Sequence, residues 1–240
     1  MTTGGSAVAI GGGTGLPLVL RCMLRAGLDP TAVVTMADDG GSSGHLRREL
    51  GMLPPGDIRN CLVALADPGS ELAPVFQYRF ASGEGLAGHA IGNLIIAALA
   101  DLEGGFGEAV EAAGRMLGVR GSVVPSTLAD VVLSGWDSAG RRVIGQARVA
   151  ETEGPISQVR LEPRDAPAYG PALDAIHDAD VVVIGPGSLF TSIIPNFLVS
   201  GVTDALRESD ARVVTADLTD AGDPARHDQD RLLAALTEVW

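Results

Sequence analysis

The sequence predicts an α/β fold, a Rossmann-like three-layer sandwich with a mostly parallel sheet and a small antiparallel β excursion. Three short apolar runs carry this prediction, because each leads into a glycine-rich or polar loop and then into a helical pattern. The runs are Ala7–Ile10, Ala32–Ala37 and Ala179–Ile184. Strands that alternate with helices in this way pair in parallel, since a parallel neighbour needs a crossover connection.

Length and composition predict a single domain over residues 1–240, because a chain of this size with 46% hydrophobic residues can bury one core. The helical pattern recurs between the strands and is bounded by Gly or Pro. Helices are predicted at Leu16–Ala26, from His45 onward, and at Gly56–Ala66, Glu71–Tyr78, Gly88–Leu102, Phe106–Leu117, Pro171–Asp178, Val202–Glu208 and Arg231–Val239, with a last strand at Arg212–Ala216.

The pattern of apolar residues changes over residues 122–162 and predicts the antiparallel excursion there. Apolar residues alternate in Asp130–Ser134, Arg142–Val149 and Gln158–Leu161, and a turn sequence lies at Asp137–Gly140. Alternation of this kind is typical of strands with one buried face.

The charged residues exclude several classes of function. All 17 basic residues are Arg, which excludes a Walker-type phosphate loop, a Schiff-base lysine and a pyridoxal site. The net charge of −13 argues against a nucleic-acid partner, because such binding requires a basic face. A phosphate held locally by Arg or by backbone N–H groups remains compatible with this composition.

No run of about 18 apolar residues occurs, and the N-terminus lacks the pattern of a signal peptide. We therefore expect a cytoplasmic protein without a membrane span. Cys22 and Cys61 lie in apolar helical patterns and are expected to be buried thiols, not a disulfide.

The three loops after the apolar runs are predicted to converge, because ligands of open parallel sheets bind beyond the carboxyl ends of the strands. Glycines there let the backbone approach a phosphate, and the N–H groups of the following helix bind it. The alternative is a purely steric need for glycine in a tight turn, with hydroxyls that cap the next helix. The candidates are Gly12, Gly13, Thr14 and Gly15 in the first loop and Gly185, Gly187, Ser188 and Thr191 in the third, where Ser192 is a further donor.

The second loop adds two adjacent carboxylates, Asp38 and Asp39, followed by Ser42 and Ser43. These carboxylates could bind a ribose or Mg²⁺, act as a base, or cap the following helix. Capping explains only one of them, so the pair favours a function. No metal is firmly predicted.

Two further polar groups lie in predicted helices. In the segment Pro54–Asn60, helix capping explains Asp57 and leaves Arg59 as the best ligand for a phosphate, with Asn60 beside it. His89 and Asn93 are four residues apart, so within one helix they share a face. A lone histidine there would be a satisfied core residue, but the pair predicts a polar stripe facing the cleft.

Together these segments resemble the YvcK-like gluconeogenesis factors, which are related to the CofD-type phospho-L-lactate transferases of deazaflavin-coenzyme synthesis. The resemblance rests on long motifs in the expected order, namely GGGTGL, VTMADDGGSSGHLRRELGMLPPGDIRNCLVALAD, QYRF, GHAIGNLIIAALADL and VVVIGPGSLFTSIIPNFLV. It implies a bacterial cytoplasmic regulator that binds nucleotide sugars such as UDP-N-acetylglucosamine and is needed for cell shape and cell-wall synthesis during gluconeogenic growth. The resemblance implies that no cofactor is required. It is compatible with a bound Mg²⁺ ion and with a homodimer.

Two other functions remain open from the sequence. One is a transferase that moves a phospholactyl-type group from a nucleotide diphosphate carrier to a deazaflavin acceptor, with Asp38 or Asp39 on Mg²⁺ as the catalytic candidates. The other is a dinucleotide cofactor site, which is weakened because GGGTG lacks the GxGxxG spacing. Relative to the resembling family, the chain is expected to be shortened after about residue 206, where a strand and one wall of the cleft are absent from the pattern.

Overall fold

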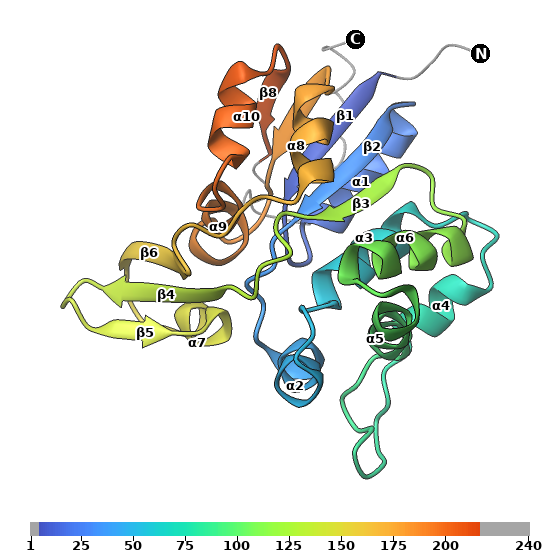
Figure 1. Cartoon of the computed structure of the whole chain (residues 1–240), viewed down its shortest axis with the longest axis horizontal. Coiled ribbons are helices and arrows are strands. Elements are labelled where there is room, and N and C mark those ends of the chain that lie inside the picture. The colour runs from blue at the N-terminus through green and yellow to red at the C-terminus, as the bar shows by residue number, and fades with distance from the viewer. Residues whose placement is uncertain (1–4, 217–240) are drawn as a thin grey trace, which may run out of the picture.

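A five-stranded parallel sheet forms the centre of the protein, as the computed structural model shows for the described residues 5–216 (Figure 1). Its strand order is β3-β2-β1-β7-β8, and every neighbouring pair is parallel. The strands are β1 Ser6–Gly11, β2 Asp29–Val34, β3 Ser122–Pro125, β7 Val181–Ile184 and β8 Arg212–Thr215. The predicted α/β class is confirmed.

The central strands are the apolar runs of the sequence. Ala9 and Ile10 in β1 and Val182 and Val183 in β7 are completely buried, because helices cover both faces of a parallel sheet. The second run is displaced from its prediction, since β2 ends at Val34 whereas residues 35–37 stay buried beyond the sheet edge. The apolar residues of this segment are therefore explained by burial and not by membership of a strand.

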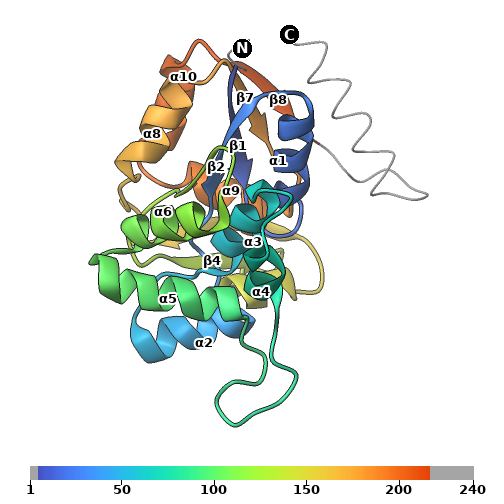
Figure 2. The ribbon, with the colours of Figure 1, turned by 90° about the vertical axis from the view of Figure 1, so that its right-hand side faces the viewer.

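Helices cover both faces of the sheet and complete three layers (Figure 2). On one face α1 Leu16–Arg25 packs against α3 Gly56–Leu65, and α6 Phe106–Leu117 lies beside α3. On the other face α8 Gly170–His177 packs against α10 Val202–Glu208.

The small antiparallel sheet has the order β5-β4-β6, with β4 Val132–Asp137, β5 Arg142–Ile144 and β6 Ile156–Glu162. Two details of the prediction are wrong. Residues 122–125 form β3 of the parallel sheet, and the expected strand Arg142–Val149 stops at Ile144. Gly145 has a φ of +104°, which breaks the strand and starts α7 Gln146–Ala150.

The remaining helices lie beyond the carboxyl ends of the parallel strands or follow β7 (Figure 1). They are α2 Gly41–Leu50, α4 Leu72–Gln77, α5 Ile91–Glu103, the π-helix Leu189–Ile193 and α9 Ile194–Phe197. The predicted start at His45 is four residues late.

The predicted helix Gly88–Leu102 begins three residues too early, because residues 79–90 form an extension that we call the arm. An antiparallel bridge between Arg79 and Ala90 closes its base. Gly83, Gly85 and Gly88 have positive φ values, which exclude a helix there. The arm extends away from the body in both views (Figures 1 and 2).

Cys22 and Cys61 are both buried, as expected. Within residues 5–216, no helix is long and apolar enough to cross a membrane. The predicted helix Arg231–Val239 lies outside the described residues.

Replacing Leu20 in α1 by Ala is expected to lower the free energy of unfolding by about 2–5 kcal/mol, because this side chain is completely buried. Leu102→Ala serves as the control, since Leu102 is 79% exposed and its loss should change stability by less than about 0.5 kcal/mol. Urea unfolding measures both. Equal losses in the two variants would contradict this assignment of the core.

Candidate functional site

The first and third glycine loops are in direct contact, as adjacent parallel strands require. A side chain at Gly15 would lie 2.5 Å from the carbonyl oxygen of Pro186, and one at Gly187 would lie 3.6 Å from that of Gly12. At Gly13 it would lie 3.4 Å from Ser192 Oγ. The glycines therefore allow the two loops to approach each other closely.

Asn196 fixes the third loop to the end of β1. Its Nδ2 donates to the carbonyl oxygens of Gly11, at 3.2 Å, and Ser192, at 2.8 Å. Thr191 and Ser192 are buried, whereas Thr14 and Ser188 are exposed. The loop predicted over Gly185–Ser192 is therefore partly helical, because the π-helix begins at Leu189.

Asp57 connects the first loop to α3. Its Oδ2 accepts a 2.7 Å hydrogen bond from the N–H of Gly13, and no side-chain bond caps α3. Gly12 has no room for a Cβ, which would lie 2.5 Å from Thr35 Cγ2 and 2.9 Å from Asp57 Oδ2. The predicted capping role of Asp57 is wrong. Its carboxylate lies at the candidate site.

The environment of Asp57 raises the pKa of its carboxyl from 3.8 to about 6. Burial is the largest cause, because it disfavours the charged form, and the negative charge of Asp38 adds to it. The Gly13 N–H and the Arg59 charge act in the opposite direction. Asp57 thus changes its charge close to neutral pH.

The second loop reaches the same place through Asp38 and Ser43. The Gly56 N–H, at the start of α3, donates to Ser43 Oγ at 3.1 Å. A Cβ at Gly56 would lie 3.4 Å from Asp38 Oδ2, while Asp38 Oδ1 accepts from the Gly40 N–H at 3.0 Å. The first and second loops therefore meet at the first turn of α3, and the third loop lies against the first.

Asp39 has a different environment from Asp38. Its Oδ1 accepts from the Ala147 N–H at 2.8 Å, in the first turn of α7, and Gly145 leaves room for the same carboxylate. This is the geometry of a helix cap. Asp39 joins α7 to the second loop, so it caps a helix distant in sequence and not the following helix that the sequence predicted.

Ser42, His89 and Asn93 form a second polar cluster. Ser42 Oγ is 3.0 Å from His89 Nδ1 and accepts from Asn93 Nδ2 at 3.1 Å, and all three residues are buried. The predicted shared helical face is wrong, because His89 belongs to the arm and precedes α5. The arm and the helix nevertheless bring both side chains to the same hydroxyl of α2.

Arg59 points away from the loops. Asp57 and Arg59 are two residues apart on α3, so they project about 200° apart around its axis. Arg59 Nη2 donates to Asn60 Oδ1 at 2.7 Å, and the Arg59 stem packs against Gly92 of α5. The residues predicted as one site thus divide between two sides of α3.

Asp38 and Asp57 are suited to a Mg²⁺ ion that also binds a ligand phosphate. Each carboxylate uses one oxygen for a backbone N–H and keeps the other. Mg²⁺ is commonly held by one or two carboxylates plus substrate phosphates. Within residues 5–216 no cluster of three or more His, Cys, Asp or Glu is suited to hold a metal by itself.

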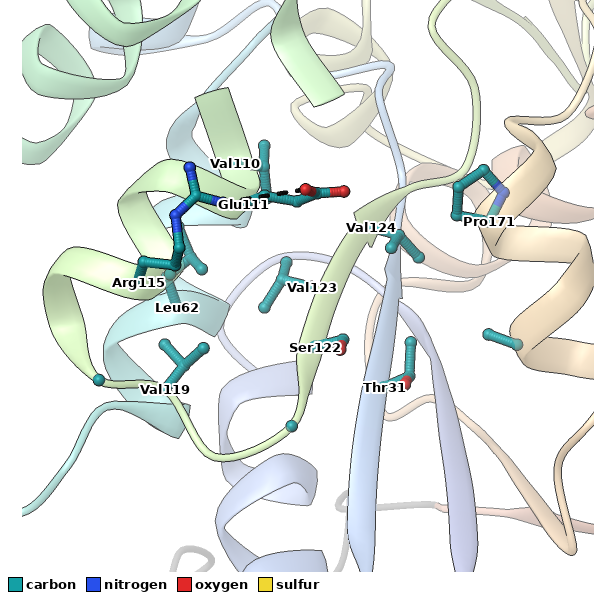
Figure 3. Close-up of a pocket in the computed structure, with 14 residues that line it drawn as sticks. Thr31, Leu62, Val110, Glu111, Arg115, Val119, Ser122, Val123, Val124 and Pro171 are labelled. Atoms are coloured by element: carbon teal, nitrogen blue, oxygen red, sulfur yellow. Dashed lines mark ion pairs between the residues drawn. The ribbon is translucent and has the colours of Figure 1, made fainter. Parts of the chain in front are cut away.

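A pocket of about 510 Å³ lies elsewhere, at the β3 edge of the sheet between α6 and α8 (Figure 3). Its wall carries the ion pair between Arg115 and Glu111, at 4.0 Å, together with Thr31 and Ser122. None of the predicted site residues lines it. No motif identified in the sequence indicates this pocket.

Comparison with known proteins identifies close relatives. The family model described as 2-phospho-L-lactate transferase CofD matches residues 7–236. A protein of Nostoc sp. is 50% identical over 208 residues, which are 87% of this chain and 46% of that protein. The gluconeogenesis factor of Bacillus subtilis is 45% identical over 204 residues, which are 85% of this chain and 64% of that protein.

Solved structures agree with these matches. A crystal structure of a Bacillus halodurans protein superposes with a TM-score of 0.86 at 39% identity, over 98% of this chain and 78% of the other. The matched part of the chain spans between about half and two thirds of the curated relatives, from 46% of the Nostoc protein to 64% of the Bacillus subtilis protein.

Replacing Asp57 by Asn should stabilise the protein above pH 6 and leave it nearly unchanged at pH 4. With the pKa raised, the carboxyl contributes its full stability below pH 3.8 and loses it as the pH rises to about 6. A pKa unit corresponds to about 1.4 kcal/mol, so the gain at pH 8 is at most about 3 kcal/mol. Urea unfolding at pH 4 and pH 8 measures it. A variant that is less stable than the original protein at pH 8 would contradict the burial of this charge.

Proposed function

The chain belongs to the family of the 2-phospho-L-lactate transferase CofD, and from this membership we propose that it is a regulator that binds a nucleotide sugar of the UDP-N-acetylglucosamine type. The relatives named gluconeogenesis factor support a regulatory function connected with gluconeogenic growth. We extend the proposal to a cytoplasmic protein that acts on cell shape and cell-wall synthesis.

The convergence of the three loops is the observation that supports this proposal best: the first two meet at the start of α3, and the third lies against the first. The N–H groups of Gly13 and Gly185 donate to Asp57 and to the Ile10 carbonyl oxygen. Those of Thr14, Gly15, Gly187 and Ser188 can approach a diphosphate closely, because the loop glycines carry no side chain. The loops lie at adjacent strands, where open α/β sheets bind nucleotides. A diphosphate is the group that best matches this backbone.

The acidic side chains at this place require a cation. A diphosphate beside Asp38 and Asp57 would be repelled unless a divalent ion lay between them, and Arg59 is directed to the other side of α3. We therefore propose that Mg²⁺ joins the carboxylates to the diphosphate. Ser43 holds the second loop in position through Gly56.

A transferase is the second candidate, and the match to the transferase family model favours it. In that function, Mg²⁺ on Asp38 and Asp57 would stabilise the charge on the departing phosphate of a nucleotide carrier. The phospholactyl-type group would form a new bond from its phosphorus to an oxygen of the deazaflavin acceptor. The bond from that phosphorus to the nucleotide would break, and the remaining nucleotide would be released.

UDP-N-acetylglucosamine with Mg²⁺ is expected to raise the melting temperature by about 5 °C or more at saturation, because a ligand selective for the folded state stabilises it. The shift should weaken as the pH falls below 6, since the proton on Asp57 displaces the metal. Thermal unfolding at pH 5.5 and pH 8 measures both effects. Unchanged melting at millimolar ligand and Mg²⁺ would contradict the proposal.

Asp57→Asn should abolish the part of this shift that depends on Mg²⁺, because the amide keeps an acceptor for Gly13 but has no charge for the metal. Asp101→Asn, an exposed change on α5, is the matched control and should bind as the original protein does. A Mg²⁺-dependent shift that persists in Asp57→Asn would place the ion elsewhere.

The transferase predicts nucleotide release when protein, Mg²⁺, the nucleotide carrier and the deazaflavin acceptor are incubated together. Chromatography of the nucleotides measures this release. Release that requires both the acceptor and Asp57 would favour the enzyme, and ligand binding without turnover would favour the regulator.

A further inference from the structure

Arg59 is a buried cation that forms no ion pair with a carboxylate among residues 5–216. It is only 5% exposed, and its Nε and Nη1 atoms are buried without a hydrogen-bond partner. Its one hydrogen bond, from Nη2, ends on the neutral amide of Asn60, whose Oδ1 also accepts from Gln77 at 3.3 Å. An ionised group in this position is costly unless an anion joins it.

A second arginine adds to the positive charge. Burial lowers the pKa of Arg59, and the positive charge of Arg79 lowers it further, while Asp57 opposes them. Arg79 lies at the base of the arm, where its Nη1 donates to the carbonyl oxygen of Gly88 at 2.5 Å. Two guanidinium groups therefore repel each other here, and among the described residues no ion pair joins either to a carboxylate.

The N-terminus of α5 lies at the same place. This helix has 13 residues, no acidic residue in its first turn and no side-chain cap. A Cβ at Gly92 would lie 2.8 Å from Arg59 Cδ, so the arginine passes directly along the first turn. The helix terminus adds a partial positive charge to that of the guanidinium groups.

We propose that Arg59, Arg79 and the N-terminus of α5 form a second anion-binding site, separate from the loop site, that takes the phosphate group of a small molecule. A phosphate suits it because its oxygens match the planar guanidinium fork and the N–H of Gly92. The N–H groups of Ile91 and Asn93 already donate to the carbonyl oxygens of Tyr78 and Ala90. The site lies on the opposite side of α3 from Asp57, so it does not depend on the proposed nucleotide function.

Entry to this site involves the arm. The arm contributes Arg79 and His89, and residues 81–88 are exposed on an arm with glycines at positive φ. Displacing the base of the arm would move Arg79 relative to Arg59 and would separate His89 from Ser42. An anion between Arg59 and Arg79 would then hold the arm against α3 and α5, which links occupancy of this site to the position of the arm.

The test is thermal unfolding of the full chain with inorganic phosphate or glycerol phosphate, each against sodium chloride at equal ionic strength. Phosphate should give a saturable rise in melting temperature that chloride does not give. Arg59→Met should remove the rise, and Arg79→Met should weaken the apparent dissociation constant by about tenfold. Arg207→Met, which alters an exposed arginine of α10, is the matched control.

Each outcome decides the proposal. A rise with glycerol phosphate that exceeds the rise with inorganic phosphate identifies a phosphate ester as the ligand, and the reverse identifies the free ion. No phosphate-specific rise in the original protein, or an equal rise in Arg59→Met, would overturn the site. If Arg59→Met does not fold, Arg59→Lys keeps the charge without the fork and should bind phosphate about tenfold more weakly. An unchanged constant in that variant would overturn the site as well.

Asp57→Asn separates this inference from the proposed function. The variant should keep the phosphate response while it loses the Mg²⁺-dependent nucleotide response. A phosphate response that disappears in Asp57→Asn and persists in Arg59→Met would assign the anion to the loop site and overturn the second site.

Discussion

The hydrogen bond from the Gly13 N–H to Asp57 is the contact on which the arrangement of the site depends. It joins the turn after β1 to the first turn of α3, 44 residues further along the chain. Through Gly56 the same turn of α3 contacts Ser43 and Asp38, so one helix start holds two of the three loops. The third loop follows because β7 pairs with β1.

This contact has an electrostatic cost that the fold does not remove. A carboxylate that is partly buried beside another carboxylate is less stable as an anion, and one backbone N–H offsets only part of the loss. A cation between Asp38 and Asp57 would relieve the repulsion. At Arg59 the buried charge is positive, so an anion beside it would have the corresponding effect. Helix α3 thus carries a partly buried carboxylate, Asp57, on one side and a buried guanidinium group, Arg59, on another.

The sequence predicted the sheet well because burial on both faces leaves an unmistakable pattern. Ala7–Ile10 and Ala179–Ile184 are apolar throughout, and the structure places both at the centre of the sheet. The location of loops that follow such strands is a consequence of parallel pairing. The strand ends were harder to predict. Met36 and Ala37 are buried although they lie beyond the end of β2, and Gly145 interrupts a segment that alternation alone predicts to be a strand.

The side-chain roles were less predictable, since each depends on a partner distant in sequence. Asp57 fits the local rule for an acidic residue in the first helical turn, and nothing in its neighbours indicates Gly13. Asp39 resembles Asp38 in sequence, yet Ala147 of the antiparallel sheet decides its role. His89 and Asn93 meet at Ser42 although only Asn93 is helical.

The arm lies next to both proposed sites. His89 of the arm reaches Ser42, whose neighbour Ser43 holds Gly56 beside Asp38. The charge of Arg79, at the base of the arm, lowers the pKa of Arg59. A change in the position of the arm would therefore act on the second loop through one hydroxyl and on Arg59 through one charge. Because both effects reach α3, an anion at Arg59 and a cation at Asp57 would each alter the electrostatic environment of the other. Opposite charges on one helix favour joint occupancy, and the expected coupling between the two ligands is positive.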